Sequence, residues 1–433
     1  MPDEQKQNPS LTQFNTILTS LKDHISAGDM NEYYTKEELK YRIPRNELEQ
    51  KWAVIKLARA LSSNHLPYTS VPITYVLTPE ISRELHFCDQ DLSTVFFEGR
   101  SSLGSAPEYI TEALSDEAIA SSKLEGAVTT ELVAKNMLRK NIPPKNKDEQ
   151  MIVNNHQAMQ FIRDKKDILL TPAFIREIQG IVTKGTLPEE SQSGVFRSTN
   201  DVSVIDRVTG EVIHYPPDAE KIESMISALC DLVNADRVHK EDREKNFVHP
   251  IIVSIALHFL IGYIHPFYDG NGRTARTLFY WYVLSRGYDV FSYMPISKVI
   301  QQAPAQYRDA YLATEEDELD LTYFIRYNIR CIKKARKALI DHLKQENIRK
   351  SNVDKAISKL PNVSKRQASI LSYMVEYKAE EFGIQEIADR FSVTYQTART
   401  DLMHLADSRY LCMMKRGKAF FYRVSSDWLQ KIT

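Results

Sequence analysis

The feature that most constrains this chain is a polar loop between two apolar segments. Residues 265–276 read HPFYDGNGRTAR, whereas 251–264 is almost wholly apolar and 274–284 resumes an apolar, aromatic pattern. This pattern predicts two buried helices joined by the loop, with the second helix beginning near Asn271 or Gly272. A glycine-rich turn at a helix N-terminus directs backbone N–H groups and the positive end of the helix dipole at one point. The sequence therefore predicts an anion site between two core helices.

The loop also carries side chains that handle phosphate. Arg273 and Arg276 are three residues apart, so they rise from one face of the first helical turn and can hold separate phosphates of one polyphosphate. Asp269 offers the hard oxygen ligand that magnesium prefers when it bridges phosphates. His265 can accept a proton from a hydroxyl near neutral pH. Each of these residues alone is explained more simply as a helix cap, a turn residue or a surface charge. Together, at this spacing, they favour phosphate chemistry.

The loop matches HPFx(D/E)GNGRxxR at every specified position, and the chain thereby resembles the Fic (Fido) family. The resemblance implies an enzyme that moves AMP from ATP, with Mg²⁺, to a Ser, Thr or Tyr hydroxyl of itself or of a target protein. It makes His265 the general base and Asp269 the magnesium ligand. The nucleotide-binding residues that it implies in this loop are Gly270, Asn271, Gly272, Arg273, Thr274, Ala275 and Arg276.

A second motif lies upstream, where residues 115–127 read SDEAIASSKLEGA. The acidic first turn and the apolar face predict a helix that is opened by Ser115. Ser121 and Glu125 match the (S/T)xxxE(G/N) pattern of Fic proteins that carry an inhibitory helix. The resemblance implies such a helix at about 115–128, with the Glu125 carboxylate paired with Arg276 where the γ-phosphate of ATP must go. Whether Glu125 also positions a water that removes AMP stays open.

Residues 193–217 predict a short β-hairpin in an otherwise helical region, because Val204 and His214 lie in short β-prone runs on either side of a turn-rich DRVTG. The resemblance implies a flap that holds the target segment by strand addition, and a purely structural hairpin is the alternative. GVFR at 194–197 resembles the family's lead-in and is interpreted as a fold marker.

In the stretch 294–329, the resemblance implies that Tyr307 contacts the nucleotide. Ala303 stands where the family often places an asparagine near the base.

The C-terminal part predicts a separate unit. Residues 384–391 and 395–405 have helical patterns around a tight turn, and 411–414 and 420–424 alternate around KRGK, which resembles a winged helix-turn-helix. Residues 350–433 hold 14 Lys and Arg against 9 Asp and Glu. DNA contact and protein docking or dimerisation both stay open for this unit. For DNA, the contacting residues would be Thr394, Tyr395, Gln396, Thr397 and Arg399 for bases, and Lys415, Arg416 and Lys418 for phosphates.

Composition agrees with an ordinary globular protein of more than one domain. The chain has 433 residues, 42% of them hydrophobic and 26% charged, and its net charge of −1 argues against polyanion binding by the whole molecule. The four cysteines form no CxxC, so we expect neither a zinc site nor a disulfide framework. A polar N-terminus and an apolar run too short to span a bilayer lead us to expect a cytoplasmic protein without membrane contact.

The predicted architecture is mainly α. It comprises an N-terminal helical region at 1–78, a Fic domain with its hairpin at 79–345, and a winged helix at 350–433. The expected function is protein adenylyltransfer. The alternatives are a DNA-binding regulator that uses the Fic-like region as a nucleotide sensor, or transfer of phosphate or another nucleotidyl group. The complete loop, including His265, argues against a nucleotide sensor, because sensing needs no general base. Gly270–Asn271–Gly272 differs from the Ala-Asn-Lys of the Doc branch, which argues against phosphate transfer. The target, the stimulus that relieves inhibition and any homo-oligomer are not specified.

Overall fold

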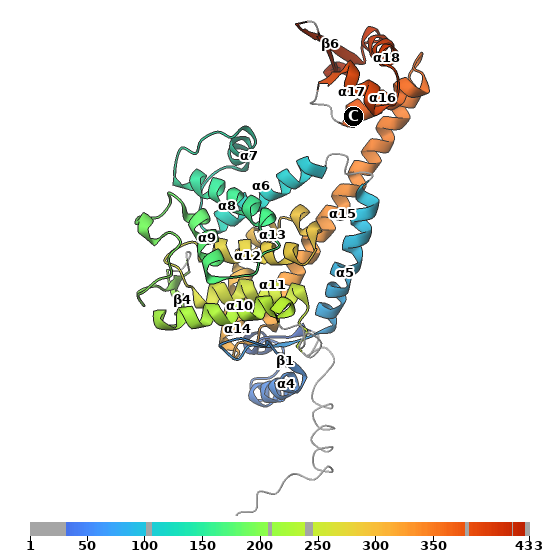
Figure 1. The fold of residues 1–433 in the computed structure, drawn as a ribbon. Helices are drawn as coiled ribbons and strands as arrows, with labels where there is room; N and C mark the ends of the chain where they lie inside the picture. The colour runs from blue at the N-terminus through green and yellow to red at the C-terminus, as the bar shows by residue number, and fades with distance from the viewer. Residues whose placement is uncertain are drawn as a thin grey trace, which may run out of the picture. The chain divides into compact units, whose positions relative to one another are not determined.

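The computed structural model describes residues 32–100, 106–206, 210–238, 246–376, 381–417 and 419–428 (Figure 1). Backbone contacts divide these residues into two units. The first contains 32–92 and 112–335, and the second includes the described residues from 336 onward. The fold is mainly α, with three small sheets of two or three strands in the part of the chain that the structure describes, which confirms the predicted class.

Two antiparallel helices form the centre of the first unit. α11 (Pro250–Ile264) and α12 (Asn271–Ser285) confirm the predicted helix pair. α11 is buried along nearly its whole length, because α10 (Ile222–Val238) and α12 pack against it. α12 also packs against α8 (Lys147–Asp164) and α9 (Pro172–Thr183). The loop between α11 and α12 is therefore held on both sides by rigid, buried helices.

The upstream helix differs from the prediction at both ends. α6 spans Ala106–Leu124, so Ser115 lies inside the helix and is buried, and Glu125 follows the helix instead of belonging to it. The prediction that Ser115 opens the helix was wrong, because residues 106–114 contain good helix formers and no interior breaker, which extends the helix upstream. The glycine that follows Glu125 has φ of 93°, a left-handed conformation that ends the helix.

Further helices surround this centre. Their bounds are α5 (Pro79–Arg100), α7 (Glu131–Lys140), α13 (Ile296–Gln301), α14 (Pro304–Glu316) and α15 (Thr322–Ser358), with short 3-10 turns η1 (Glu190–Gln192), η2 (Ala219–Lys221) and η3 (Asp289–Tyr293). The predicted hairpin is present as β3 (Val204–Ile205) and β4 (Val212–His214), which pair antiparallel. Residues 207–209 of its turn lie outside the described residues.

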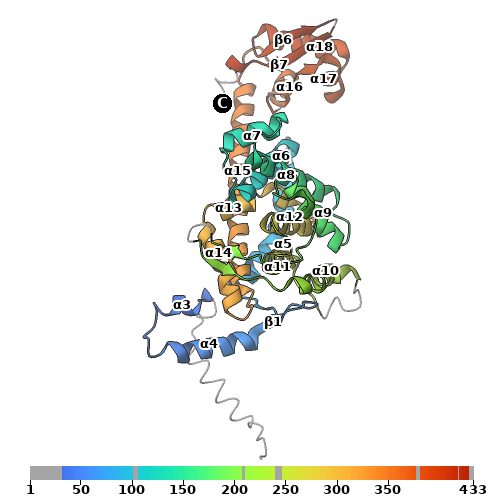
Figure 2. The ribbon, with the colours of Figure 1, turned by 90° about the vertical axis from the view of Figure 1, so that its left-hand side faces the viewer.

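The N-terminal region contains α3 (Lys36–Leu39) and α4 (Leu48–Ser62), shown beside β1 in Figure 2. Within the helical region that the sequence predicted at 1–78, α3 and α4 are separated at Pro44, which lacks the N–H that a helix interior needs. An antiparallel pair, β1 (Ser63–His65) and β2 (Thr74–Val76), follows α4 and was not predicted from the sequence. β2 bonds to residues 319–321, which joins this region to the segment directly before α15.

The described residues that follow α15 form three helices and a small sheet. Their elements follow the order α16 (Lys365–Glu376), β5 (Phe382–Gly383), α17 (Ile384–Arg390), α18 (Tyr395–Asp407), β6 (Leu411–Arg416) and β7 (Ala419–Val424). The strands are arranged β5-β7-β6 around a core that includes Leu371, Leu402 and Tyr422. The two helices and two strands expected here are present, and β5 is an additional strand of two residues that no periodicity could show.

Candidate active site

The 265–276 loop is fixed by its own backbone. His265 ends α11 with φ of 48° and ψ of 57°, and Gly270 precedes α12 with φ of 82°, so the chain reverses direction at two left-handed positions. Asn271 closes the loop, because its side chain accepts from the Phe267 N–H at 3.0 Å and donates to the Phe267 carbonyl at 2.8 Å. The Asn271 side chain therefore shapes the loop, and α12 begins where the sequence predicted.

An anion position lies at the N-terminus of α12. The first N–H groups of a helix have no partner inside the helix, so those of 271–273 point outward with the positive end of the dipole. The Thr274 N–H, by contrast, donates to the Gly270 carbonyl at 2.9 Å, and the Thr274 side chain is fully buried. A Cβ on Gly272 would lie 2.1 Å from Oε1 of Glu125 and 3.1 Å from Nη1 of Arg276. A carboxylate thus already occupies this position.

Arg276 holds that carboxylate together with the end of α6. Its Nη2 donates to Glu125 Oε1 at 2.8 Å and to the Ser121 carbonyl at 3.0 Å, and its Nε donates to Ser121 Oγ at 2.8 Å. Burial lowers the pKa of Arg276, but the neighbouring acidic groups, with Glu125 foremost, together outweigh burial, so the net shift of this pKa is upward. The structure brings Ser121, Glu125 and Arg276 together, as the resemblance implied.

Arg273 faces a different neighbour. It is 1% exposed, and its guanidinium donates to the Val182 carbonyl at the end of α9 at 2.6 Å and to Asp269 Oδ1 at 3.3 Å. Burial lowers its pKa. Arg273 and Arg276 therefore bracket the start of α12 from two sides, and contact with two phosphates of one ligand stays a prediction.

Asp269 is placed at the mouth of the loop, with its side chain 46% exposed. Its carbonyl accepts from Gln179 Nε2 at 3.0 Å, which ties the loop to α9. Among the residues that the structure describes, no group of three or more His, Cys, Asp or Glu side chains could hold a metal ion by itself. Asp269 therefore offers one exposed carboxylate. This fits a cation whose other ligands are phosphate oxygens and water molecules.

His265 is suited to act as a base. Its Nδ1 lies 3.3 Å from the Gly262 carbonyl, which favours a proton on Nδ1 and leaves Nε2 as the acceptor. Burial lowers the pKa of His265 to about 4, so the ring is neutral at physiological pH. Gly262 itself is required by packing, since a Cβ there would lie 2.6 Å from the hydroxyl of Tyr311.

Arg197 was interpreted from sequence as a fold marker, and the structure gives it a more specific place. It is 3% exposed, and its Nε donates to the His265 carbonyl at 2.9 Å. Its Nη1 donates to the Thr199 carbonyl at 2.9 Å, its Nη2 donates to the Pro217 carbonyl, and its backbone N–H donates to the Pro266 carbonyl at 2.8 Å. Arg197 therefore fixes the backbone at the left-handed histidine. No local sequence pattern predicts a buried arginine that donates to backbone carbonyls. Only the position of Arg197 within GVFR indicated that it matters for the fold.

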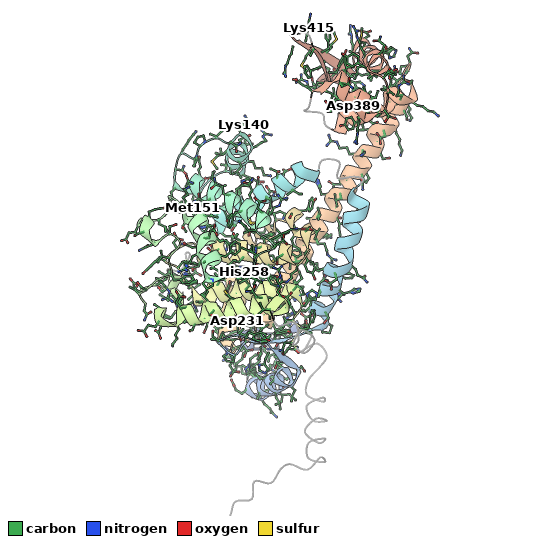
Figure 3. The ribbon with its side chains drawn as sticks, in the orientation of Figure 1. Lys140, Met151, Asp231, His258, Asp389 and Lys415 are labelled. Atoms are coloured by element: carbon green, nitrogen blue, oxygen red, sulfur yellow. The ribbon has the colours of Figure 1, made fainter. Side chains whose placement is uncertain are left out.

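Tyr307 lies in the wall behind Arg276. Its hydroxyl is 2.7 Å from Nε2 of His258, a buried side chain of α11 that Figure 3 shows in the interior of the first unit. Burial lowers the pKa of His258 to about 3, so this ring is neutral. Burial raises the pKa of Tyr307, and Arg276 opposes that shift. Tyr307 thus supports the guanidinium from behind, and a contact with the base stays a prediction. Ala303 lies nearby, directly before α14.

Glu117 anchors α6 to the pocket walls and was not singled out from sequence. It accepts from the Tyr280 hydroxyl of α12 and from the Ser297 N–H of α13, each at 2.8 Å, and also from Ser297 Oγ. Its pKa is raised by burial. The adjacent Asp116 accepts from Lys298 of α13 at 2.8 Å. α6 is therefore fixed to α12, which carries Arg276, and to α13.

Comparisons with known proteins agree with this geometry. The profile of the Fic/DOC family matches residues 169–283. A protein adenylyltransferase Fic of Nematostella vectensis is 26% identical over 290 residues, which cover 64% of this chain and 61% of that protein. One from Drosophila grimshawi is 28% identical over 122 residues, which cover 28% of this chain and 22% of that protein. The chain thus spans less than two thirds of the length of these relatives.

A solved structure shows the same fold. The crystal structure of a Fic family protein from Desulfovibrio desulfuricans G20 superposes with a TM-score of 0.53 at 17% identity, covering 81% of this chain and 98% of that chain. Within the described ranges, we find no helix with both the length and the apolar character needed to cross a bilayer. The loop, its two core helices and the family match together lead to one conclusion: this chain contains a Fic domain, whose match to the Fic/DOC family spans residues 169–283.

Proposed function

We propose that the chain is a protein adenylyltransferase that Glu125 holds inactive. The observation that carries the proposal is the Glu125 carboxylate above Gly272, 2.8 Å from Arg276 and at the positive end of α12. A carboxylate is itself an anion, and its presence supports a site built for the phosphates of ATP. The relatives from Nematostella vectensis and Drosophila grimshawi are protein adenylyltransferases, which supports the same reaction.

In the proposed reaction, the triphosphate lies against the N-terminus of α12 with its terminal phosphate at Arg276. His265 accepts the proton of a Ser, Thr or Tyr hydroxyl at Nε2 while the hydroxyl oxygen attacks the α-phosphorus. The bond between the α-phosphorus and the bridging oxygen breaks, and pyrophosphate leaves with its electron pair. Asp269 would hold Mg²⁺, which neutralises charge on the phosphates. Arg197 keeps the His265 backbone in place for this proton transfer.

Inhibition follows from exclusion. The Glu125 carboxylate and a terminal phosphate need the same guanidinium, so ATP either binds weakly or binds with its α-phosphate out of line for attack. Ser121 holds the other edge of Arg276, which keeps the guanidinium aligned with Glu125.

The type of group transferred decides the reaction class. We expect the Glu125→Gly chain, incubated with ATP and Mg²⁺, to gain the mass of one AMP per modified hydroxyl in intact-protein mass spectrometry. The reason is that the proposed nucleophile attacks the α-phosphorus. A gain of one phosphate would assign the chain to phosphoryl transfer instead, and the absence of any adduct on the chain or on proteins of a cell extract would contradict transferase activity.

We further propose that the second unit is a winged helix whose α18 and β6–β7 wing contact DNA. The order of its elements supports a winged helix, and the 49% exposed Tyr395 at the start of α18 supports an available recognition surface. In a gel-shift assay, double-stranded DNA should shift the full chain at low salt, and Arg399→Ala with Lys415→Ala should remove the shift. Lys359→Ala, outside this surface, serves as the control. Absence of a shift at any salt would favour protein docking.

The cytoplasmic location and a homo-oligomer stay predictions.

A further inference from the structure

A cavity lies at the end of α11 and α12 that is opposite the 265–276 loop. It has a volume of about 220 Å³ and is lined by the last turns of α10 and α12, by the start of α11 with the residues before it, and by Pro67 and Tyr68. Because α11 is 15 residues long, about 20 Å separates this cavity from the loop. A molecule bound in the cavity therefore does not touch the residues proposed for AMP transfer.

Aromatic side chains supply much of the cavity wall. Tyr282 at the end of α12 and Tyr288 line it together with Tyr68 and Phe247. Phe247 is 65% exposed, so a large apolar ring stands open to solvent at this cavity. Walls of this kind favour a ligand with aromatic rings, which pack on other rings in offset or edge-to-face contacts. A cavity of about 150 Å³ holds benzene and drug-sized sites begin at about 300 Å³, so this cavity fits one or two rings.

One ion pair lines the cavity and determines the charge of the ligand. Arg286 Nη2 donates to Asp236 Oδ1 at 2.6 Å and to the Val233 carbonyl at 2.9 Å, and the guanidinium carbon lies 4.4 Å from the centroid of the Tyr282 ring. The Arg286 side chain is 9% exposed, whereas that of Asp236 is 36% exposed. The positive charge is thus compensated inside the wall, and the carboxylate offers an acceptor. This arrangement favours a neutral ligand with an N–H or O–H donor, because a phosphate or carboxylate would be repelled.

The wall around the cavity is already formed. The Tyr288 hydroxyl donates to Asp89 Oδ1 at 2.7 Å, and Nε2 of His249 lies 3.1 Å from Asp89 Oδ2. Nδ1 of His249 accepts from the Ile251 N–H at 3.2 Å, which ties this group to the first turn of α11. Tyr68 has φ of 58°, a left-handed conformation that is costly for a bulky residue and that is found preferentially at functional sites. Preformed concave walls are typical of small-molecule sites.

We propose that this cavity is a second binding site, for a flat, neutral aromatic molecule of one or two rings that donates an N–H or O–H to Asp236. The rings of the ligand pack on the aromatic wall, and Arg286 keeps the Asp236 carboxylate in place. This site is independent of the proposed transfer of AMP, because none of the residues that line it belongs to the 265–276 loop.

Indole is the probe for this site, because it has two fused rings and one N–H donor. In calorimetric titration of the full chain, indole should bind with a Kd of about 0.1 mM. 1-Methylindole keeps the rings and lacks the donor, so it should bind about tenfold more weakly, and the anion benzoate should not bind. Absence of indole binding near its solubility limit would overturn the site. Equal affinity for the two indoles would overturn the role of Asp236, and equal affinity for benzoate would overturn the preference for a neutral ligand.

Two variants locate the bound probe. Ala235→Phe, at a partly exposed position of the cavity wall, fills the cavity and should abolish indole binding. Phe247→Ala removes the exposed ring and should weaken binding about fivefold. Tyr41→Ala removes another ring, which is 91% exposed and lies outside the cavity, and this control should bind indole as wild type does. Thermal unfolding without indole should match wild type in all three. Wild-type affinity in both Ala235→Phe and Phe247→Ala would place indole elsewhere and overturn the proposal.

Competition with ATP separates this cavity from the proposed nucleotide site. In the Glu125→Gly chain with Mg²⁺, saturating ATP should leave the Kd of indole unchanged. Displacement of indole by ATP would place the probe in the nucleotide site and overturn the second site. If Glu125→Gly binds no ATP, the proposed inhibition fails, whereas Ala235→Phe and Phe247→Ala still decide whether the cavity binds the probe.

Discussion

Replacing Glu125 with glycine should raise the rate of AMP incorporation from ATP labelled at its α-phosphate by about ten- to a hundredfold. The wild-type carboxylate bonds Arg276 at 2.8 Å with 24% of its side chain exposed. Hydrogen bonds to charged groups are worth about 1.5–3 kcal/mol, and each 1.4 kcal/mol is tenfold. Glycine removes this competitor and leaves the start of α12 and Arg276 available to the terminal phosphate.

Two matched variants separate this effect from loosening of the fold. Glu125→Gln keeps the shape and removes the charge, so its rate should fall between those of wild type and Glu125→Gly. Glu131→Gly removes a neighbouring acid at the first position of α7, which pairs with Lys135 and not with Arg276, so it should leave the rate at the wild-type level. Equal labelling by wild type and Glu125→Gly would end the inhibition model.

Replacing His265 with alanine in the active background should lower transfer by about 10² to 10⁴, the usual contribution of a general base. The fold should persist, because the histidine ends α11 and its backbone is held by Arg197. Circular dichroism and thermal unfolding should therefore match the parent. His86→Ala, at an exposed position of α5, is the control and should leave transfer unchanged.

The pH profile adds a check on the same residue. Because burial lowers the pKa of His265 to about 4, the ring is neutral and able to accept a proton at any pH well above that value. The transfer rate should therefore hold as the pH falls from neutral to about 5, and decline as the pH approaches 4. A decline centred near 6.5, the value of an ordinary histidine, would place His265 in a solvated setting that contradicts the observed burial.

The parts of the site that lie close together in sequence were predictable. Apolar patterning gave α11 and α12, and the glycines and asparagine between them predicted where α12 begins, since left-handed and capping positions have strong residue preferences. The hairpin strands followed from short β-prone runs around a turn. The pairing of Glu125 with Arg276, 151 residues apart, came only from a resemblance, because no local pattern encodes such a contact.

Other features had no sequence signal. The bonds of Arg197 to four carbonyls and of Glu117 to α12 and α13 depend on tertiary packing, which periodicity does not report. The start of α6 was placed too late because a serine followed by acids looks like a cap even where the helix continues upstream. β1, β2 and β5 are two or three residues long, too short for alternation to appear.

The proposed inhibition requires that Glu125 stands where the terminal phosphate of ATP binds. Isothermal titration calorimetry with ATP and with ADP, on wild type and Glu125→Gly in the presence of Mg²⁺, measures this directly. We predict that Glu125→Gly binds ATP about tenfold or more tightly than wild type does, while ADP, which lacks that phosphate, changes little. An equal gain for both nucleotides, or no gain for ATP, would contradict the account.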